Sequence, residues 1–182
     1  MTQQSVTTWY LEQRDPALLK PSRTPDPAPQ LLRAEIPSPA LNRYLYTHVG
    51  GDWHWRDRLP WTYERWMQWL DRPEVQTWVL YERGTSAGYF ELEKQADDDV
   101  EIAYFGIAPE FIGRGYGGYL LTACIEKAWL MGAKRVWVHT CSLDHEAALK
   151  NYQARGMTLY KTETHQKDVS NQQIGPWPGA RD

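Results

Sequence analysis

The sequence has few cysteines and no long hydrophobic run, and both shortages limit the class of protein. Its 182 residues include only Cys124 and Cys141, which are too few for a disulfide framework and are not spaced as metal ligands. No apolar stretch approaches the roughly 20 residues that cross a bilayer, and the N-terminus lacks the basic start and apolar centre of a secretory signal. We therefore expect no metal site and a cytoplasmic location.

A strong charge of either sign is missing as well. The 20 Lys and Arg and the 23 Asp and Glu give a net charge of −3, which offers no general electrostatic reason to bind nucleic acid or an anionic membrane. We expect no nucleic acid and no membrane as a partner. The length suits one domain with a substantial core rather than two, and we expect a monomer or a homodimer.

Proline is plentiful, but it is concentrated near the N-terminus. Seven of the 12 prolines fall within the first 39 residues, a density that excludes long helices and central strands there. We predict a proline-rich arm over residues 1–38, packed on the domain, with short strands at 6–11 and 31–36. The domain itself is predicted to span residues 39–166, and an irregular tail follows at 167–182.

Beyond the arm, hydrophobic periodicity and turn residues predict alternating strands and helices. A hairpin turn at 83–86 and an acidic turn at 97–99 favour antiparallel pairing of the strands around them, whereas the strand after the next helix must run parallel. Strands are predicted at 42–49, 77–81, 87–94, 100–108, 135–140 and 157–165, and helices at 62–70, 120–129 and 145–155.

A run of glycines lies between the strand predicted at 100–108 and the helix that follows. Glycines let successive backbone N–H groups point into one concavity at the positive end of the helix dipole, and such a nest suits a pyrophosphate. Gly113, Gly115 and Gly118 also match the dinucleotide fingerprint G-x-G-x-x-G. The distance from the strand, the antiparallel neighbours and the lack of an acid after the next strand disfavour that interpretation. A dinucleotide-binding protein and a plain tight turn remain as alternatives.

The glycine run resembles a motif of the GNAT superfamily of acyl-coenzyme A N-acyltransferases. That motif reads Q/R-x-x-G-x-G/A and follows a strand, and Gly115 and Gly117 fall on its two small positions. Ile112 stands where Gln or Arg is usual, which removes one side-chain donor. Family members bind phosphate mainly through backbone N–H groups, so the resemblance still implies a phosphate site.

A second match to the same family follows at the expected distance. Residues 145–157 resemble the motif N-x-x-A-x-x-x-Y-x-x-x-G-F, with His145 in place of Asn and Met157 in place of Phe. Tyr152 falls on the tyrosine that faces the coenzyme sulfur in many members. The two motifs occur in the correct order, and together they indicate a member of the superfamily.

The resemblance implies a fold and a cosubstrate. The fold is of the α/β (α+β) class, with a strongly twisted, mostly antiparallel mixed sheet that splays where coenzyme A enters and with helices on both faces. Gly106 in mid-strand is consistent with a splayed or bulged strand. The implied cosubstrate is acetyl-coenzyme A. The residues expected to contact its pyrophosphate are Gly113, Arg114, Gly115, Tyr116, Gly117 and Gly118, and those expected along its pantetheine are Phe105, Gly106, Ile107 and Ala108.

The same resemblance implies an N-acetyltransferase that moves an acetyl (acyl) group to a primary amine by direct attack. The transfer needs a base for the amine, a donor for the oxyanion and a proton for the thiolate. The backbone N–H of Ile107 is expected to hold the oxyanion, and Tyr152 to protonate the thiolate. Glu101, six residues before Ile107, is expected to be the base.

Each catalytic assignment has an alternative. Tyr152 can be a core tyrosine with a satisfied hydroxyl, and Glu101 can be a solvated strand residue beside the acidic turn. His139 and His145 are competing bases. A further pair of carboxylates, at positions 91 and 93, lies on a strand that borders the acceptor site.

The acceptor is an amine-bearing molecule whose class the sequence leaves open. Aromatic and acidic residues crowd one segment: Asp52, Trp53, Trp55, Asp57, Trp61, Trp66 and Trp69. Aromatic faces with carboxylates would suit a cationic amine. A simpler interpretation places the last two tryptophans in a core stripe and lets the first two seal the arm. A module that binds acyl-coenzyme A without catalysis is the remaining rival, and the presence of both Glu101 and Tyr152 weighs against it.

Overall fold

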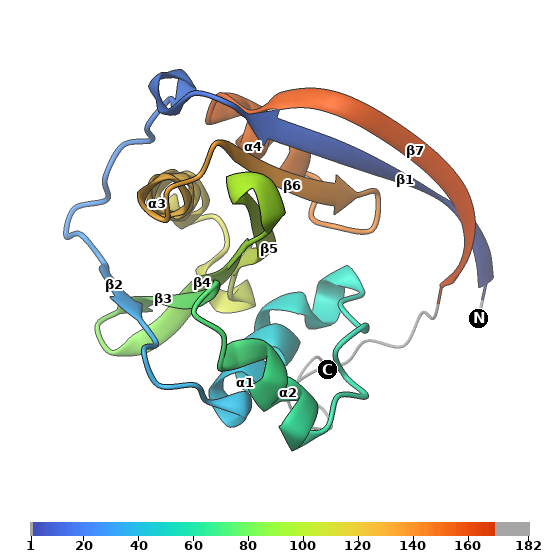
Figure 1. Cartoon of the computed structure of the whole chain (residues 1–182), viewed down its shortest axis with the longest axis horizontal. Helices are drawn as coiled ribbons and strands as arrows, with labels where there is room; N and C mark the ends of the chain where they lie inside the picture. The colour runs from blue at the N-terminus through green and yellow to red at the C-terminus, as the bar shows by residue number, and fades with distance from the viewer. Residues whose placement is uncertain (1, 170–182) are drawn as a thin grey trace.

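Seven strands form one sheet in the computed structural model, which describes residues 2–169 (Figure 1). The strands are β1 (Thr2–Gln13), β2 (Gln30–Arg33), β3 (Val75–Glu82), β4 (Thr85–Lys94), β5 (Asp99–Ile107), β6 (Arg135–Cys141) and β7 (Thr158–Val169). The α-helices of the described residues are α1 (Pro39–Gly50), α2 (Tyr63–Leu70), α3 (Tyr116–Leu130) and α4 (Ala148–Ala154).

The strand order in the sheet is β2-β3-β4-β5-β6-β1-β7, and β5 and β6 form its parallel pair. The hairpin β3–β4 and the antiparallel pair β4–β5 are as predicted. Figure 1 shows α3 on one side of the central strands and α1 with α2 on the other. The predicted mixed, mostly antiparallel sheet with helices on both faces is therefore confirmed.

The prediction of a strand at 42–49 was wrong, because this segment forms most of helix α1. Ser38 caps the helix by accepting a hydrogen bond from the N–H of Leu41. Pro39 occupies the first turn, where a backbone N–H would have no partner within the helix, so the missing N–H of proline costs nothing. The buried residues Asn42, Leu45 and Val49 recur at helical spacing. The Ser-Pro pair was the signal of a helix start that the periodicity alone did not provide.

The N-terminal strand is longer than the predicted strand at 6–11 and lies inside the sheet. β1 pairs antiparallel with β6 from Thr8 to Gln13 and with β7 from Thr2 to Glu12. The first proline is Pro16, so the residues before it are free to donate ladder hydrogen bonds. β2 is shorter than the strand predicted at 31–36.

Between β1 and β2 the proline-rich segment crosses the outer face of α3, where the chain passes along the edge of the molecule in Figure 1. The N–H of Ser22 donates to Oγ1 of Thr122 on α3 at 2.9 Å. The N–H of Lys20 donates to the carbonyl of Arg155, just after α4, at 3.2 Å. The proline-rich segment is therefore hydrogen-bonded both to α3 and to the end of α4.

The last two elements differ from prediction at their ends. α4 begins later than residue 145, because His145 forms a turn in which its Nδ1 accepts a hydrogen bond from the N–H of Ala147 at 3.0 Å. β7 continues to Val169, beyond the predicted end at 165. The remainder of the predicted tail, residues 170–182, lies outside the described residues.

The core lies between the sheet and α3. Leu120, Leu121 and Ile125 of α3 are 0% exposed, as are Leu11 of β1 and Val136 of β6. Because Leu11 is fully buried, the N-terminal strand is part of this core. Burying such a side chain contributes about 1.5–3 kcal/mol to stability. Within residues 2–169 no helix is long and apolar enough to span a membrane.

Strands β5 and β6 pair over only three residues and then separate, as predicted. The pairs run from Asp99 opposite Arg135 to Glu101 opposite Trp137. Opposite β4, the register of β5 shifts between Ile102 and Tyr104, which places a bulge at the intervening alanine. A bulge bends its strand and increases its twist, and here it occurs where β5 leaves β6.

Gly106 lies in the part of β5 that has separated from β6, and the bulge itself is three residues earlier. A Cβ on Gly106 would lie 2.4 Å from Cγ1 of Val49 on α1. The glycine is required by the close approach of α1 to the strand, whereas the edge of β5 beyond Glu101 is left unpaired by β6.

Candidate active site between two diverging strands

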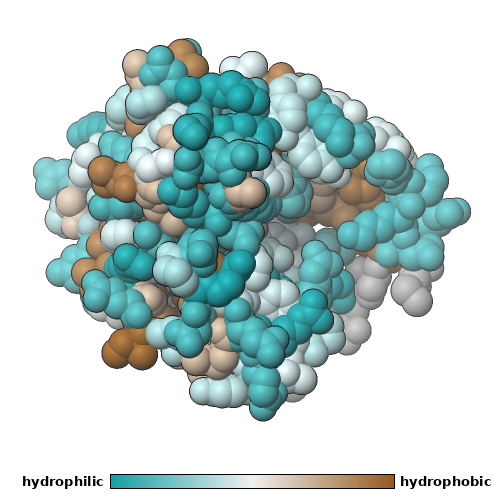
Figure 2. Space-filling model, in the orientation of Figure 1, coloured by the Kyte–Doolittle hydropathy of each residue, from teal (hydrophilic) through white to brown (hydrophobic). Residues whose placement is uncertain are grey.

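The gap between β5 and β6 opens into a cavity of about 910 Å³. Its walls are the free parts of these strands, the glycine turn before α3, the turn before α4 and residues 53–58. One end is covered by Val6 and Thr8 of β1 and by His165 and Lys167 of β7. Figure 2 shows the molecule hollowed beneath these two strands, with hydrophobic surface inside the hollow and a mostly hydrophilic surface around it. Small-molecule sites are commonly cavities of this size.

The glycine turn forms one wall of the cavity for reasons of backbone conformation. Gly113 and Gly115 have φ values of 83° and 81°, and no atom lies within 4 Å of a Cβ built on either. The left-handed conformation, and not crowding, therefore favours glycine at both positions. A Cβ on Gly118 would instead lie 2.6 Å from Oγ of Ser22, so this glycine allows the proline-rich segment to approach.

The start of α3 presents free backbone donors toward the cavity. Its N-cap is Gly115, which has no side chain to cap the first turn, and the first N–H groups of a helix have no partner within it. Gly113, Gly115, Gly117 and Gly118 line the cavity. Such donors, together with the helix dipole, are suited to an anion, and the phosphate site stays a prediction.

Two residues of the predicted phosphate site direct their side chains elsewhere. Arg114 lies over the ring of Phe111, with 4.9 Å between the guanidinium carbon and the ring centroid. The hydroxyl of Tyr116 donates to Glu82 at 2.6 Å, which ties the start of α3 to the β3–β4 hairpin. The backbone N–H of Arg114 is also engaged, because it donates to the carbonyl of Phe111 at 3.4 Å. Ala108, predicted along pantetheine, is buried and does not line the cavity.

The backbone of β5 offers hydrogen-bonding groups to the cavity. The N–H of Ala108 donates to the carbonyl of Ala87 on β4 at 2.9 Å. Backbone groups of successive residues in an antiparallel strand point to opposite sides, so those of Phe105 and Ile107 point away from β4. Because β6 has already separated, the N–H of Ile107 faces the cavity, as its predicted oxyanion role requires.

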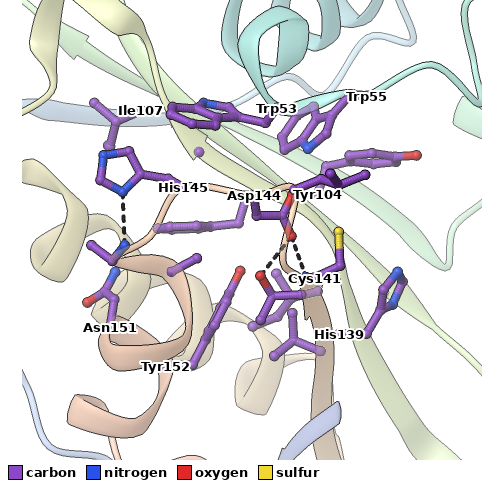
Figure 3. Close-up of a pocket in the computed structure, with 18 of the residues that line it drawn as sticks. Trp53, Trp55, Tyr104, Ile107, His139, Cys141, Asp144, His145, Asn151 and Tyr152 are labelled. Carbon is purple, nitrogen blue, oxygen red and sulfur yellow. Dashed lines mark hydrogen bonds between the residues drawn. The ribbon is translucent and has the colours of Figure 1, made fainter. Parts of the chain in front are cut away.

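Tyr152 projects from α4 into the same cavity (Figure 3). Its ring meets Phe105 of β5 edge to face, with 6.1 Å between centroids. Among residues 2–169 no group hydrogen-bonds its hydroxyl, so it is not the satisfied core tyrosine considered as the alternative. Burial raises the pKa of Tyr152 well above its ordinary value, and the nearby Asp144 adds to the effect. The hydroxyl therefore stays protonated at neutral pH.

Glu101 and His139, predicted as competing bases, lie in contact. Nδ1 of His139 is 3.6 Å from Oε1 of Glu101, and Nε2 of Gln95 donates to Oε2 of the same carboxylate at 2.7 Å. Both residues line the cavity. The carboxylate of Glu101 raises the pKa of His139 above its ordinary value, partial burial opposes this, and Asp144 and Asp57 add to the increase.

The other candidate bases are engaged or placed differently. Glu91 is buried and its Oε1 accepts hydrogen bonds from Arg58 and Trp69, each at 2.7 Å. Glu93 is paired with Arg72. Neither carboxylate is available to accept a proton from a substrate.

The aromatic cluster near residue 60 surrounds a cation of the protein itself, the guanidinium group of Arg58. The guanidinium carbon of Arg58 lies over several rings, at 4.7 Å from Trp61, 5.6 Å from Trp66, 4.4 Å from Trp69 and 4.4 Å from Tyr104. The hypothesis that these rings receive a cationic amine is therefore not supported by the geometry.

Trp53 and Trp55 do not seal the proline-rich arm, which corrects the other interpretation of the aromatic segment. Both line the cavity, where Figure 3 shows them side by side on the wall opposite α4. The ring of Trp53 meets that of His145 edge to face, 5.0 Å between centroids. This contact joins the segment after α1 to the turn before α4 across the cavity.

Asp144 is a site residue that the sequence did not reveal. Its Oδ2 accepts hydrogen bonds from Oγ1 of Thr140 and from the N–H of Cys141, at 2.7 and 2.8 Å (Figure 3). It thereby fixes the end of β6 where His139 lies. Burial, with Asp144, raises the pKa of the Cys141 thiol, so this thiol is a poor nucleophile. An aspartate three residues after a strand was the only available signal.

Comparison with known proteins gives a family match and similar folds. A family model described as the acetyltransferase (GNAT) family matches residues 41–157. A solved structure of a GCN5-related N-acetyltransferase from Sphaerobacter thermophilus is similar at 20% identity and a TM-score of 0.63, over 94% of this chain and 52% of that one. One from Kribbella flavida is similar at 17% identity and a TM-score of 0.63, over 93% and 61%.

At these sequence identities the structural similarity shows a common fold and nothing further about function. The chain spans between half and two thirds of the length of these two structures. No curated protein sequence matches it significantly.

Proposed function

The chain belongs to the acetyltransferase (GNAT) family, and from this membership we propose that it transfers an acetyl group from acetyl-coenzyme A to a primary amine. The observation that carries the proposal is the cavity between β5 and β6, which joins free helix N–H groups at one end to an ionisable pair at the other. Binding, activation of the amine and departure of the thiol each have a group in that one space.

The described residues fit coenzyme A. The uncapped first turn of α3 supplies donors for a pyrophosphate. The unpaired edge of β5 supplies the backbone groups of Phe105 and Ile107 for an amide-bearing chain such as pantetheine. The residues that would hold the cosubstrate are therefore the glycines of the turn and these two strand residues.

The thioester supplies the acyl group: the amine nitrogen bonds to the carbonyl carbon and loses a proton, the carbon–sulfur bond breaks, and the sulfur gains a proton. The N–H of Ile107 donates to the oxyanion that develops in this step. The amine proton is accepted at Glu101 or at a group in contact with it. A hydrogen bond from Tyr152 stabilises the departing sulfur.

Tyr152 is better suited to donate a hydrogen bond than to give up its proton fully. Its raised pKa makes it a weaker acid than an exposed phenol, and proton transfer is most efficient when the pKa lies near the working pH. Any proton that Tyr152 gives up returns to it through solvent from the protonated base, so that the enzyme is unchanged after one turnover.

The test is a panel of amines with detection of the released thiol. The panel contains amino acids, polyamines, aminoglycosides and lysine peptides, each with acetyl-coenzyme A and the purified full chain. Thiol release that depends on one amine class, with a matching acetylated product, is the expected result. Binding of coenzyme A without thiol release for any amine would reject the enzyme and leave a binding module.

A further inference from the structure

We propose that His139 accepts the proton from the acceptor amine, and that Glu101 is a positioning residue that orients its ring and stabilises its cation. This inference rests on the proposed function, and it refines the assignment of the base. The family resemblance points to Glu101 alone. The geometry couples two residues that the sequence could only present as competitors.

The two residues meet where β5 and β6 begin to separate. Glu101 stands opposite Trp137 in the last pair of the two strands, and His139 follows two residues later. Side chains two apart in a strand lie on one face, so Glu101, Trp137 and His139 project together. The distance of 3.6 Å from Nδ1 to Oε1 is within ion-pair range. Catalytic hydrogen bonds are often this long before substrate binds and shorten in the complex.

The surroundings hold the carboxylate more firmly than the imidazole. Oε2 of Glu101 accepts from Nε2 of Gln95 at 2.7 Å, and Oε1 of Gln95 accepts from Nε1 of Trp137 at 3.1 Å. The side chain of Glu101 is 15% exposed, whereas that of His139 is 50% exposed. The imidazole is thus the partner that an acceptor entering the cavity would reach first.

This arrangement determines which ring nitrogen can take the proton. A neutral imidazole has one N–H and one lone pair, and the carboxylate of Glu101 favours the tautomer with the proton on Nδ1. The lone pair is then on Nε2. As the carbon–nitrogen bond forms, the proton moves from the amine nitrogen to Nε2, and the resulting imidazolium is paired with the ionised Glu101 until the proton passes to solvent.

The charges that face His139 from the neighbouring elements also favour its cation. Asp57 from the segment after α1 and Asp144 after β6 act in the same direction as Glu101. The remaining ionisable neighbours are Tyr10 of β1, whose ring centroid is 5.9 Å away, and His165 and Lys167 of β7, which line the cavity. The three carboxylates set the direction of the shift in the pKa of His139, and partial burial opposes it.

The test compares pH profiles of kcat/KM for Glu101→Gln, His139→Gln and the double variant. The wild type should gain activity as pH rises through an inflection above about 6.5, the ordinary pKa of histidine, because the imidazole must be neutral to accept a proton. His139→Gln should lower the rate roughly 100- to 1,000-fold and abolish this inflection. Glu101→Gln should keep an inflection, moved to lower pH because the stabilising charge is gone, with a lower plateau.

The double variant should be no slower than His139→Gln, since residues that act as one unit are not additive. Glu101→Asp should restore part of the wild-type inflection. Glu126→Gln removes an exposed carboxylate from α3 and should leave the profile unchanged. Independently of activity, NMR titration of His139 should give a lower pKa in Glu101→Gln than in the wild type.

The outcomes are distinguishable. A His139→Gln enzyme with the wild-type profile, beside a Glu101→Gln enzyme that has lost its inflection, would make Glu101 the base and reject the assignment alone. An unchanged His139 titration in Glu101→Gln would reject the coupling. A wild type that releases no thiol with any amine would reject the proposed function, and the assignment with it.

Discussion

Tyr152 reaches the cavity from α4, and its hydroxyl has no hydrogen-bond partner among residues 2–169. Replacing it by phenylalanine keeps the ring against Phe105 and removes only the donor. We expect kcat of Tyr152→Phe to fall roughly 10- to 1,000-fold, with little change in the affinity for coenzyme A. Steady-state kinetics and calorimetric titration measure the two quantities. Tyr63→Phe, at an exposed position of α2, is the matched control. An unaltered kcat would make Tyr152 a structural residue.

A second prediction at the same scale concerns the buried ion pair of Arg58 and Glu91, whose side chains are 6% and 1% exposed. Glu91→Gln keeps the shape of the side chain but leaves the guanidinium buried without a counter-charge. Breaking such a pair costs about 3–5 kcal/mol, and the urea unfolding midpoint should fall accordingly.

Glu163→Gln provides the comparison, since Glu163 pairs with Lys161 on the surface of β7, and exposed pairs contribute little. Equal destabilisation by the two variants would mean that the aromatic rings around Arg58 already compensate its charge.

These pairs are also what the sequence could not predict. Glu101 and His139 were predicted as competing bases, because only the register of β5 against β6 shows that they are neighbours. Glu91 was considered as a free base for a similar reason, since its partner Arg58 is 33 residues away. The tight glycine turn could be predicted, because the left-handed conformation of Gly113 and Gly115 is a property of their own backbone and needs no distant partner.

Among the elements, the glycine turn permits a direct test of the phosphate site. Gly117 has room for a side chain, since the nearest atom to a Cβ built there is Nδ2 of Asn151 at 3.8 Å. Gly117→Glu should therefore fold, and its charge should repel a pyrophosphate.

Coenzyme A at 100 times its dissociation constant stabilises a protein by about 2.7 kcal/mol, and thermal unfolding should show that shift for the wild type and for Gly117→Ala. The glutamate variant should show none. If it binds coenzyme A as tightly as the alanine control, the pyrophosphate lies elsewhere.

The elements differ in how well local sequence predicts them. The hairpin β3–β4 and helix α3 have clear turn residues and periodicity, and both were predicted. Helix α1 was predicted as a strand, and the buried residues that identify it as a helix depend on contacts with β4 and β5. Tertiary packing outweighs local preference in such cases.

For the whole molecule, the N-terminal strand is a structural member of the sheet even though it lies outside the residues that match the family model. Leu11 is 0% exposed in the main core. Leu11→Ala should cost about 2–5 kcal/mol, as expected for truncation of a buried leucine, and should lower the unfolding midpoint as measured in urea.

Leu18→Ala is the control, since Leu18 is 49% exposed in the proline-rich segment and surface changes usually stay within about 0.5 kcal/mol. A small effect at Leu11 would mean that β6 and β7 are stable without β1.

The position of β1 between β6 and β7 also has a consequence for biosynthesis. Thr7 bonds to Ser142, 135 residues further along the chain, so β1 emerges from the ribosome long before the strands on either side of it. Contacts of such sequence separation slow folding. Because β6 also forms one wall of the cavity, the ribosome must translate the chain at least as far as Cys141 before the binding cleft can form. No shorter nascent chain can bind the cosubstrate in the way proposed here.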